Sequence, residues 1–191
     1  FSQVDEAKMD FYARLTDRLP RPLTHGKRRQ LPALLDELAT EVQRRMDDDA
    51  APKPPRFLVI HGLQRARDLR QEDGLGGFAA FGDQPTAASP AQQFATILRE
   101  GPDVGIHTIA WCDTMTNLNR TIDRRTLREF SLRVAFQMSA EDSSNLLDTP
   151  AATKLGPFRA LFYSEDEGRL EKFRPYGLPS ETWLAALKPA R

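Results

Sequence analysis

The chain has 191 residues, of which 40% are hydrophobic and 28% are charged, the composition of a globular protein with one sizeable core. Its 27 basic and 27 acidic side chains cancel, so the net charge argues neither for nor against a nucleic-acid partner. No apolar run approaches the ~20 residues that cross a bilayer, and the single cysteine, Cys112, excludes an internal disulfide and a cysteine-based zinc site. We expect a cytoplasmic fragment of a longer protein, in which other segments provide any membrane anchor.

Two helices are predicted in residues 1–46. Residues 5–19 place Phe11, Leu15 and Leu19 at helical spacing, and a proline follows at once. Residues 31–46 carry the clearest apolar stripe of the chain, and Pro32 suits a first helical turn. That stripe consists of Leu31, Leu34, Leu35, Leu38 and Val42. A connector rich in aspartate and proline, residues 47–56, follows the second helix.

The middle of the chain alternates between apolar runs and turn-forming segments. Residues 57–60 and 105–112 read as short strands buried on both faces, as in a parallel sheet. Residues 71–89 read as a long loop, which in compact domains is functional or disordered. Ser89 and Pro90 are typical of a helix start, and the helix is expected to run to residue 100.

The last third of the chain predicts more strands. Asp123 can cap a short helix through Phe130, residues 132–138 form a third strand, and residues 160–163 and 170–173 form a hairpin. Strands that alternate with helices favour a mainly parallel α/β sheet. We therefore expect a single α/β domain over residues 1–191. It divides into N-terminal helices (1–46), a linker (47–56), a sheet core (57–178) and a C-terminal helix or tail (179–191).

Three segments, in order, resemble the FtsK/SpoIIIE family of hexameric DNA translocases and the related secretion ATPases. In the first, four apolar residues precede His61 and Gly62, as four precede Asp-Glu in the family's Walker B strand. In the second, a basic helix end precedes the run Val104 to His107, similar to the family's Val-Gly-Ile-His. The third resembles an Asp-Ser segment, a Gly-Pro turn and a closing strand; it comprises residues 132–134, 142–148, Ala152, 155–157 and 161–163. The resemblance covers residues 31–178.

The resemblance implies a three-layer RecA-like P-loop NTPase fold with a mainly parallel central sheet. For the parent family it also implies ATP, Mg²⁺ and a hexamer. No G-x-x-x-x-G-K-[ST] loop occurs in the sequence, and in the family this loop would precede Phe1, so the P-loop portion is missing here. We therefore expect no cofactor and no metal bound by this fragment alone.

The resemblance also marks altered positions at the Walker B motif and the sensor. His61 stands where the family's metal-orienting Asp belongs, Gly62 replaces the water-activating Glu, and Asp113 replaces a Gln sensor. A neutral imidazole has no fixed charge for Mg²⁺, and glycine has no side chain to polarise water. Pro102 further stands where the family usually has a second Arg. These changes are typical of a non-hydrolysing module, and whether the chain is an enzyme is left open.

Several side chains are candidates for contacts. His61 is either a residual nucleotide or metal contact or a polar residue bonded to backbone at the mouth of the sheet. Arg99 and Asp113 are candidates for a nucleotide or subunit interface. Arg120, Arg124 and Arg128 share one face if their stretch is helical, although Arg120 can instead lie before the helix cap. That row suits DNA phosphates or a neighbouring subunit, or is simply a solvated face.

Three functions remain open on the sequence. The first is part of an ATP-dependent DNA translocase of the cell-division and chromosome-partitioning class, with duplex DNA and further subunits as partners. The second is a degenerate pseudo-ATPase module that binds a neighbouring ATPase domain, as in tandem-domain secretion or translocase proteins. The third is an unrelated α/β binding module. No membrane contact is expected from this fragment.

Overall fold

The computed structural model describes residues 23–48, 50, 53–70 and 88–186. The predicted helix at 5–19 and nearly all of the predicted loop at 71–89 lie outside these residues. The described chain divides into two compact units, one that ends at Leu127 and one that begins at Arg128. Both strands and helices are present, so the α/β class is confirmed.

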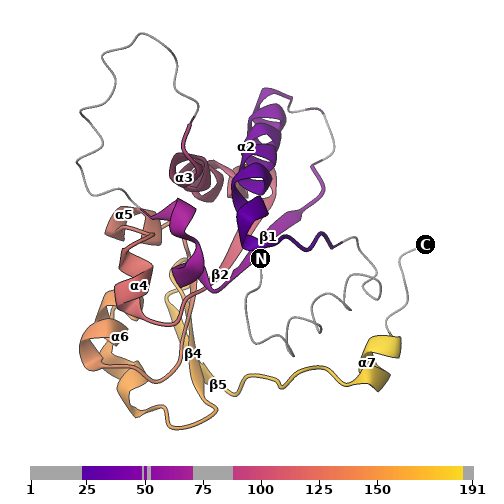
Figure 1. Ribbon diagram of the computed structural model, residues 1–191. Helices are drawn as coiled ribbons and strands as arrows, with labels where there is room; N and C mark the ends of the chain where they lie inside the picture. The colour runs from indigo at the N-terminus through magenta and orange to yellow at the C-terminus, as the bar shows by residue number, and fades with distance from the viewer. Residues whose placement is uncertain (1–22, 49, 51–52, 71–87, 187–191) are drawn as a thin grey trace. The chain divides into compact units, whose positions relative to one another are not determined.

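The first unit is built on a parallel pair of strands (Figure 1). Strand β1, Arg56–His61, pairs with β2, Ile106–Trp111, in a register that runs from Arg56↔Ile106 to His61↔Trp111. Helix α3, Pro90–Glu100, lies between them in sequence and packs against β2. Helix α2, Leu31–Asp47, packs beside α3. This is the strand–helix–strand unit that the sequence predicts.

The two long helices of the first unit start where their sequences predict. In α3 the Ser89 hydroxyl accepts a hydrogen bond from the Gln92 amide at 3.3 Å, and the Gln92 side chain accepts one from the Ser89 amide at 2.9 Å. This reciprocal pair is a capping box. The inward residues of α3 are Phe94, Ile97 and Leu98. Helix α2 carries a proline in its first turn and buries Leu31, Leu35, Val42 and Arg45.

Glycine is required at the end of α3. A Cβ added at Gly101 would lie 2.3 Å from the Ile97 carbonyl oxygen and 2.6 Å from that of Ile106. The Gly101 amide donates to the Ile97 carbonyl at 3.0 Å, and the Gly101 carbonyl accepts from the Ile106 amide at 2.8 Å. The close approach of helix end and strand start therefore excludes any side chain here.

The two faces of the β1–β2 pair differ, which corrects the prediction of strands buried on both sides. Leu58, Ile60 and Ile106 are buried. The alternate residues of both strands are exposed; they are Phe57, Val59, Ile109 and Trp111. The apolar runs were rightly taken as strands, but one apolar face of the pair meets solvent.

Short elements complete the first unit. The 3₁₀ turns are η1 Arg28–Gln30, η2 Leu63–Arg65, η3 Arg67–Leu69 and η5 Pro102–Val104. The short helices are α4, Met115–Asn119, and α5, Arg124–Leu127. Asp123 caps α5 as predicted, since its carboxylate accepts from the Thr126 amide at 2.7 Å. The helix ends at Leu127 and not at Phe130, so that prediction was too long.

The second unit contains an antiparallel sheet in the order β3-β4-β5. Its strands are β3 Leu132–Ala135, β4 Ala160–Ser164 and β5 Arg169–Phe173. The predicted hairpin of β4 and β5 is confirmed. Strand β3 pairs antiparallel with β4, so among the described strands only β1 and β2 are parallel to each other. The described strands thus form one parallel pair and one antiparallel three-stranded sheet, rather than the single mainly parallel sheet that the sequence predicts. The helical elements are α6 Ala140–Leu147, η6 Pro150–Lys154 and α7 Glu181–Ala186.

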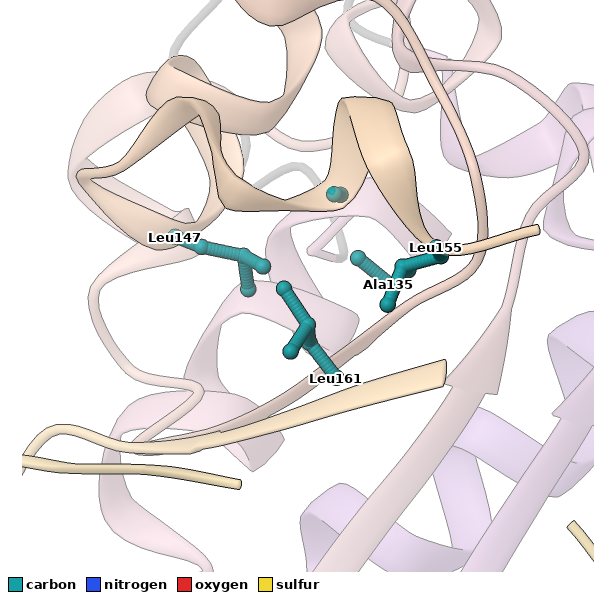
Figure 2. Close-up of a cluster of buried hydrophobic side chains, with 5 residues drawn as sticks. Ala135, Leu147, Leu155 and Leu161 are labelled. Carbon is teal, nitrogen blue, oxygen red and sulfur yellow. The ribbon is translucent and has the colours of Figure 1, made fainter. Parts of the chain in front are cut away.

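The core of the second unit lies between α6, η6 and one face of this sheet. Figure 2 shows Leu147, Leu155 and Leu161 converging beside Ala135. All four are at most 5% exposed. Burial of such side chains contributes on the order of 1.5–3 kcal/mol for each leucine, so this cluster holds helix, turn and hairpin together. Among the described helices, none is long and apolar enough to cross a bilayer.

Candidate functional site

The carboxyl edge of the parallel pair is the place where ligands bind in open α/β sheets. There the imidazole of His61 stacks on the indole of Trp111, with ring centroids 4.7 Å apart and planes at 8°. The two residues are register partners, and the ladder continues one step further because the Gly62 amide donates to the Trp111 carbonyl at 3.1 Å. The edge therefore presents a flat aromatic pair at the ends of both strands.

Burial lowers the pKa of His61 below its ordinary value of 6.5. Desolvation disfavours the charged imidazolium, so the ring is neutral at pH 7. A neutral ring stacked on Trp111 supplies no negative charge to a magnesium ion. The stack on Trp111 thus makes His61 a packed residue at the end of β1.

Gly62 follows in the left-handed conformation, with φ 88° and ψ 53°. The chain turns here into η2, and Arg65 donates its amide to the Gly62 carbonyl at 3.0 Å. A Cβ at this position has room, because its nearest neighbour, the Arg65 Cδ, lies 3.9 Å away. A side chain here would therefore strain the backbone conformation rather than clash with a neighbour, since a positive φ is unfavourable for residues other than glycine. A glutamate at this position would be held in that strained conformation.

Asp113 lies two residues beyond β2 at the same edge, as expected, and is exposed. Its carboxylate accepts a hydrogen bond from the side-chain amide nitrogen of Asn117 at 2.9 Å and one from the Thr114 hydroxyl at 3.4 Å. The bond from Asn117 is the main reason that the pKa of Asp113 is lowered. Thr114 itself caps α4 by accepting from the Asn117 backbone amide at 3.2 Å. Asp113 is thus ionised and tied to the first turn of α4.

Cys112 lies between the aromatic pair and this turn. Its Sγ is 3.8 Å from the Asp113 carboxylate and 3.7 Å from the Thr114 carbonyl. The side chain is half-buried rather than fully buried. Burial raises the pKa of the thiol above its usual value, which keeps it protonated at neutral pH and unreactive as a nucleophile.

The candidate arginines do not form one helical row. Arg120 caps the C-terminus of α4, and its guanidinium contacts the Asn117 side-chain oxygen at 3.3 Å. Arg124 opens α5, and Arg128 follows the end of that helix. The three arginines therefore belong to two separate short helices and do not share one helical face. Arg120 lies before the Asp123 cap, which is the alternative that the sequence left open. Arg99, on α3, pairs with Glu100 at 2.8 Å.

The sequence did not single out the most buried charged side chain among the described residues of the first unit. Arg45 of α2 is 1% exposed. Its Nε donates to Glu41 at 2.8 Å, and its Nη1 donates to the Val104 carbonyl at 2.8 Å. This side chain joins α2 to the η5 turn that leads into β2. The spacing of Glu41 and Arg45, four apart on a helix, was visible in the sequence as a signal for the ion pair but not for its burial.

The Asp-Ser segment of the second unit has a structural role. The Ser143 side chain is fully buried; its hydroxyl donates to the Thr149 carbonyl at 2.6 Å and accepts from the Ala152 amide at 3.1 Å. Asp142 lies in the first turn of α6, where a negative charge is favourable. Buried Arg133 donates to the carbonyls of Phe130 and Leu146 and pairs with Glu165.

Comparison with known proteins adds no relative: no family model matches the chain, and no curated protein matches it. Within the described residues, no group of three or more His, Cys, Asp or Glu side chains is placed to hold a metal ion.

Proposed function

We propose that this chain is the C-terminal part of a RecA-like motor domain of the FtsK/SpoIIIE type, and that the fragment does not hydrolyse ATP by itself. The parent would be a duplex-DNA translocase with a three-layer fold and a mainly parallel central sheet. The parallel β1–β2 pair with its α3 crossover supports this proposal, because such pairs occur almost only inside larger sheets covered on both faces. The exposed apolar face of the pair agrees with it.

The composition of the carboxyl edge is the observation that supports the proposed lack of ATP hydrolysis. A motor of this type needs an acid to orient Mg²⁺ and another to polarise water. Here a neutral His61 is stacked on Trp111, and a left-handed Gly62 follows it. ATP and Mg²⁺, which the resemblance implies for the parent, would depend on a phosphate-binding loop from an upstream segment.

A second candidate is a degenerate module that binds a neighbouring ATPase domain. The same edge favours it, because both acidic positions are altered and Gly62 has a conformation that suits glycine better than glutamate. In this case the parent would still assemble with a catalytic domain but would show no nucleotide turnover of its own. A nucleotide assay on the parent separates the two candidates.

The experiment that tests the translocase is duplex-DNA binding by the parent protein with Arg124→Ala. Arg124 is exposed at the start of α5. If it contacts phosphate, the variant should bind all sequences more weakly and release about one fewer counterion, which lowers the slope of log K against log salt by about 0.9. Fluorescence anisotropy at several salt concentrations measures both quantities.

Arg159→Ala is the matched control, because Arg159 is also exposed but lies in the second unit. Its salt slope should stay at the wild-type value. A parent that does not bind duplex DNA would reject the translocase and leave the interaction module. An unchanged slope in Arg124→Ala, with wild-type affinity, would reject this arginine as a phosphate contact.

A further inference from the structure

The surface of the second unit contains a hollow of about 310 Å³, here called the aromatic hollow. Three segments that are separate in the sequence meet there: the end of β3, the turn before β4 and the chain that leaves β5. Its volume is at the lower end of the about 300–1,000 Å³ that ligand sites enclose. The hollow is lined by Phe136, Phe158, Arg174, Pro175, Tyr176 and Gly177.

The aromatic rings of the hollow are open to solvent. Phe136, Phe158 and Tyr176 are 48%, 77% and 101% exposed. None of the three is in ring contact with another aromatic side chain of the described residues. Rings that formed a small satellite core would pack on one another, whereas these leave their faces free. Exposed aromatic side chains gathered at one hollow are typical of a binding surface.

The ring of Phe158 is exposed by an unfavourable backbone conformation. Its φ is 57°, in the left-handed region that bulky residues avoid. Gly156, two residues earlier, has φ 73°, so two left-handed residues flank the proline of the Gly-Pro turn. The ring takes no part in the leucine core of this unit. Strained positions of this kind cluster at ligand contacts, and this one lies at the hollow.

Arg174 gives the hollow a positive charge. Its side chain is exposed and forms no ion pair or cation–π contact with the described residues. None of the described residues that line the hollow is acidic. The lining therefore complements an anion. A free guanidinium binds phosphate through paired N–H donors.

Open ring faces beside a free guanidinium match the chemistry of an unpaired nucleobase and its phosphate. Bases stack on phenylalanine and tyrosine whatever their sequence, and basic side chains bind the backbone. In a duplex the bases are stacked on one another, so only a single strand offers a base to such rings. Proline-rich peptides also dock on aromatic rings, but their prolines carry no charge that Arg174 would complement.

We propose that the aromatic hollow binds single-stranded nucleic acid. Bases stack on Phe158 and Tyr176, and Arg174 binds a neighbouring phosphate. The proposal rests on the second unit alone. It is separate from the proposed motor, whose test uses duplex DNA and Arg124 of the first unit.

Fluorescence anisotropy of a labelled oligo(dT) with the whole chain tests the stacking contact. Phe158→Gly should weaken binding about tenfold, because one stacked base loses its ring. Urea unfolding should show that the variant is about as stable as the unaltered chain, since glycine accepts a φ of 57° and the lost ring is exposed. Phe57→Ala is the matched control: this exposed phenylalanine lies in the first unit, and its loss should leave the affinity unchanged.

The salt dependence of binding tests the phosphate contact. Arg174→Gln should lower the slope of log K against log salt by about 0.7, the value for one phosphate contact on a single strand. Lys154→Gln removes an exposed cation that does not line the hollow, so its slope should equal that of the unaltered chain. An unchanged slope in Arg174→Gln would overturn the assignment of this arginine to a phosphate.

Four further results would overturn the proposal. The first is a chain that does not bind oligo(dT). The second is equal affinity in Phe158→Gly and Phe57→Ala. The third is an equal loss in Phe158→Gly for a duplex of the same length, which would show that the ring contacts no unpaired base. The fourth is tighter binding of a labelled proline-rich peptide that is lost in Phe158→Gly, which would assign the hollow to a peptide.

Discussion

Arg45 shows how one residue can fix the geometry of a sheet. Its guanidinium is buried, and it joins α2 to the carbonyl of Val104 just before β2 begins. A buried guanidinium is stable only when its hydrogen bonds and its charge are satisfied. Glu41 supplies that charge at 2.8 Å and also binds Arg44 at 2.7 Å. The hydrogen bond from Arg44, followed by that from Arg45, lowers the pKa of Glu41 from 4.5 to about 2.

This shift predicts the pH dependence of stability. Because the pKa of Glu41 is lower in the folded chain, its contribution is complete above pH 4.5 and is lost as the pH falls toward 2. Glu41→Gln should therefore destabilise the chain at pH 7, by about 3 kcal/mol if Arg45 stays buried. The difference from wild type should shrink below pH 4.5. Urea unfolding at pH 7, 4 and 2.5 measures it.

Glu37→Gln is the control for this prediction. Glu37 lies one turn earlier on α2 and is exposed, so its substitution should change stability by less than about 0.5 kcal/mol. If Glu41→Gln and Glu37→Gln unfold at the same urea concentration at pH 7, the ion pair with Arg45 does not stabilise the fold.

At the scale of elements, the loop from α6 to η6 is closed by one hydroxyl. Helix α6 ends at Leu147, and Asp148 follows it in the left-handed conformation with φ 58°. The buried Ser143 hydroxyl then bonds both the Thr149 carbonyl and the Ala152 amide. These bonds place η6 over the sheet, where Ala152 joins the leucine cluster. The Asp-Ser segment therefore holds α6, η6 and the sheet of the second unit together.

Ser143→Ala should destabilise the second unit by about 1–3 kcal/mol, because it leaves the Thr149 carbonyl and the Ala152 amide without their buried partner. Ser144→Ala is the matched control, because that exposed hydroxyl donates to the Ala140 carbonyl of its own helix at 2.8 Å. Hydrogen exchange of the β3–β4 amides reports on this unit separately. Equal protection in both variants would show that the Ser143 hydroxyl is dispensable.

The elements themselves were largely predictable, because their signals are local. The Ser89–Gln92 capping box, the stripe of α2 and the β4–β5 hairpin are each encoded within a few neighbouring residues. Pairing between distant strands could not be predicted. The antiparallel partner of β3 lies about 30 residues further along the chain, and the residues of β3 suit a parallel and an antiparallel partner equally well. The exposure of Phe57 was also hidden, since an apolar run does not say which face is covered.

At the candidate site, the sequence identified the positions but not their geometry. The resemblance pointed to His61, Gly62 and Asp113. His61 is the last residue of β1, Gly62 follows it, and Asp113 lies two residues beyond β2 at the same edge. The stack of His61 on Trp111 depends on pairing between strands about 50 residues apart, which no local pattern encodes. The buried Arg45 was missed for the same reason.

For the molecule as a whole, two compact units follow one another along the chain. The first carries the parallel β1–β2 pair. One face of this pair is apolar and exposed, and its last strand residues, His61 and Trp111, are not acidic. The second is an antiparallel sheet with its own core. Under the proposed origin in a motor domain, the first unit would correspond to part of a nucleotide-binding sheet in which His61 and Gly62 stand at the acidic positions.

Titration of the purified chain with ATP and Mg²⁺ is the most direct test. It is followed by calorimetry and by the fluorescence of Trp111, in a Trp183→Phe variant so that Trp111 is the only tryptophan. Trp111 lies at the sheet edge, against His61, so a nucleotide bound there would change its emission. We expect no saturable heat and no change in emission up to about 1 mM nucleotide, an affinity no better than about −4 kcal/mol. Saturable binding of one Mg²⁺–ATP per chain, with quenching of Trp111 that is lost in His61→Ala, would show that this edge is a working nucleotide site.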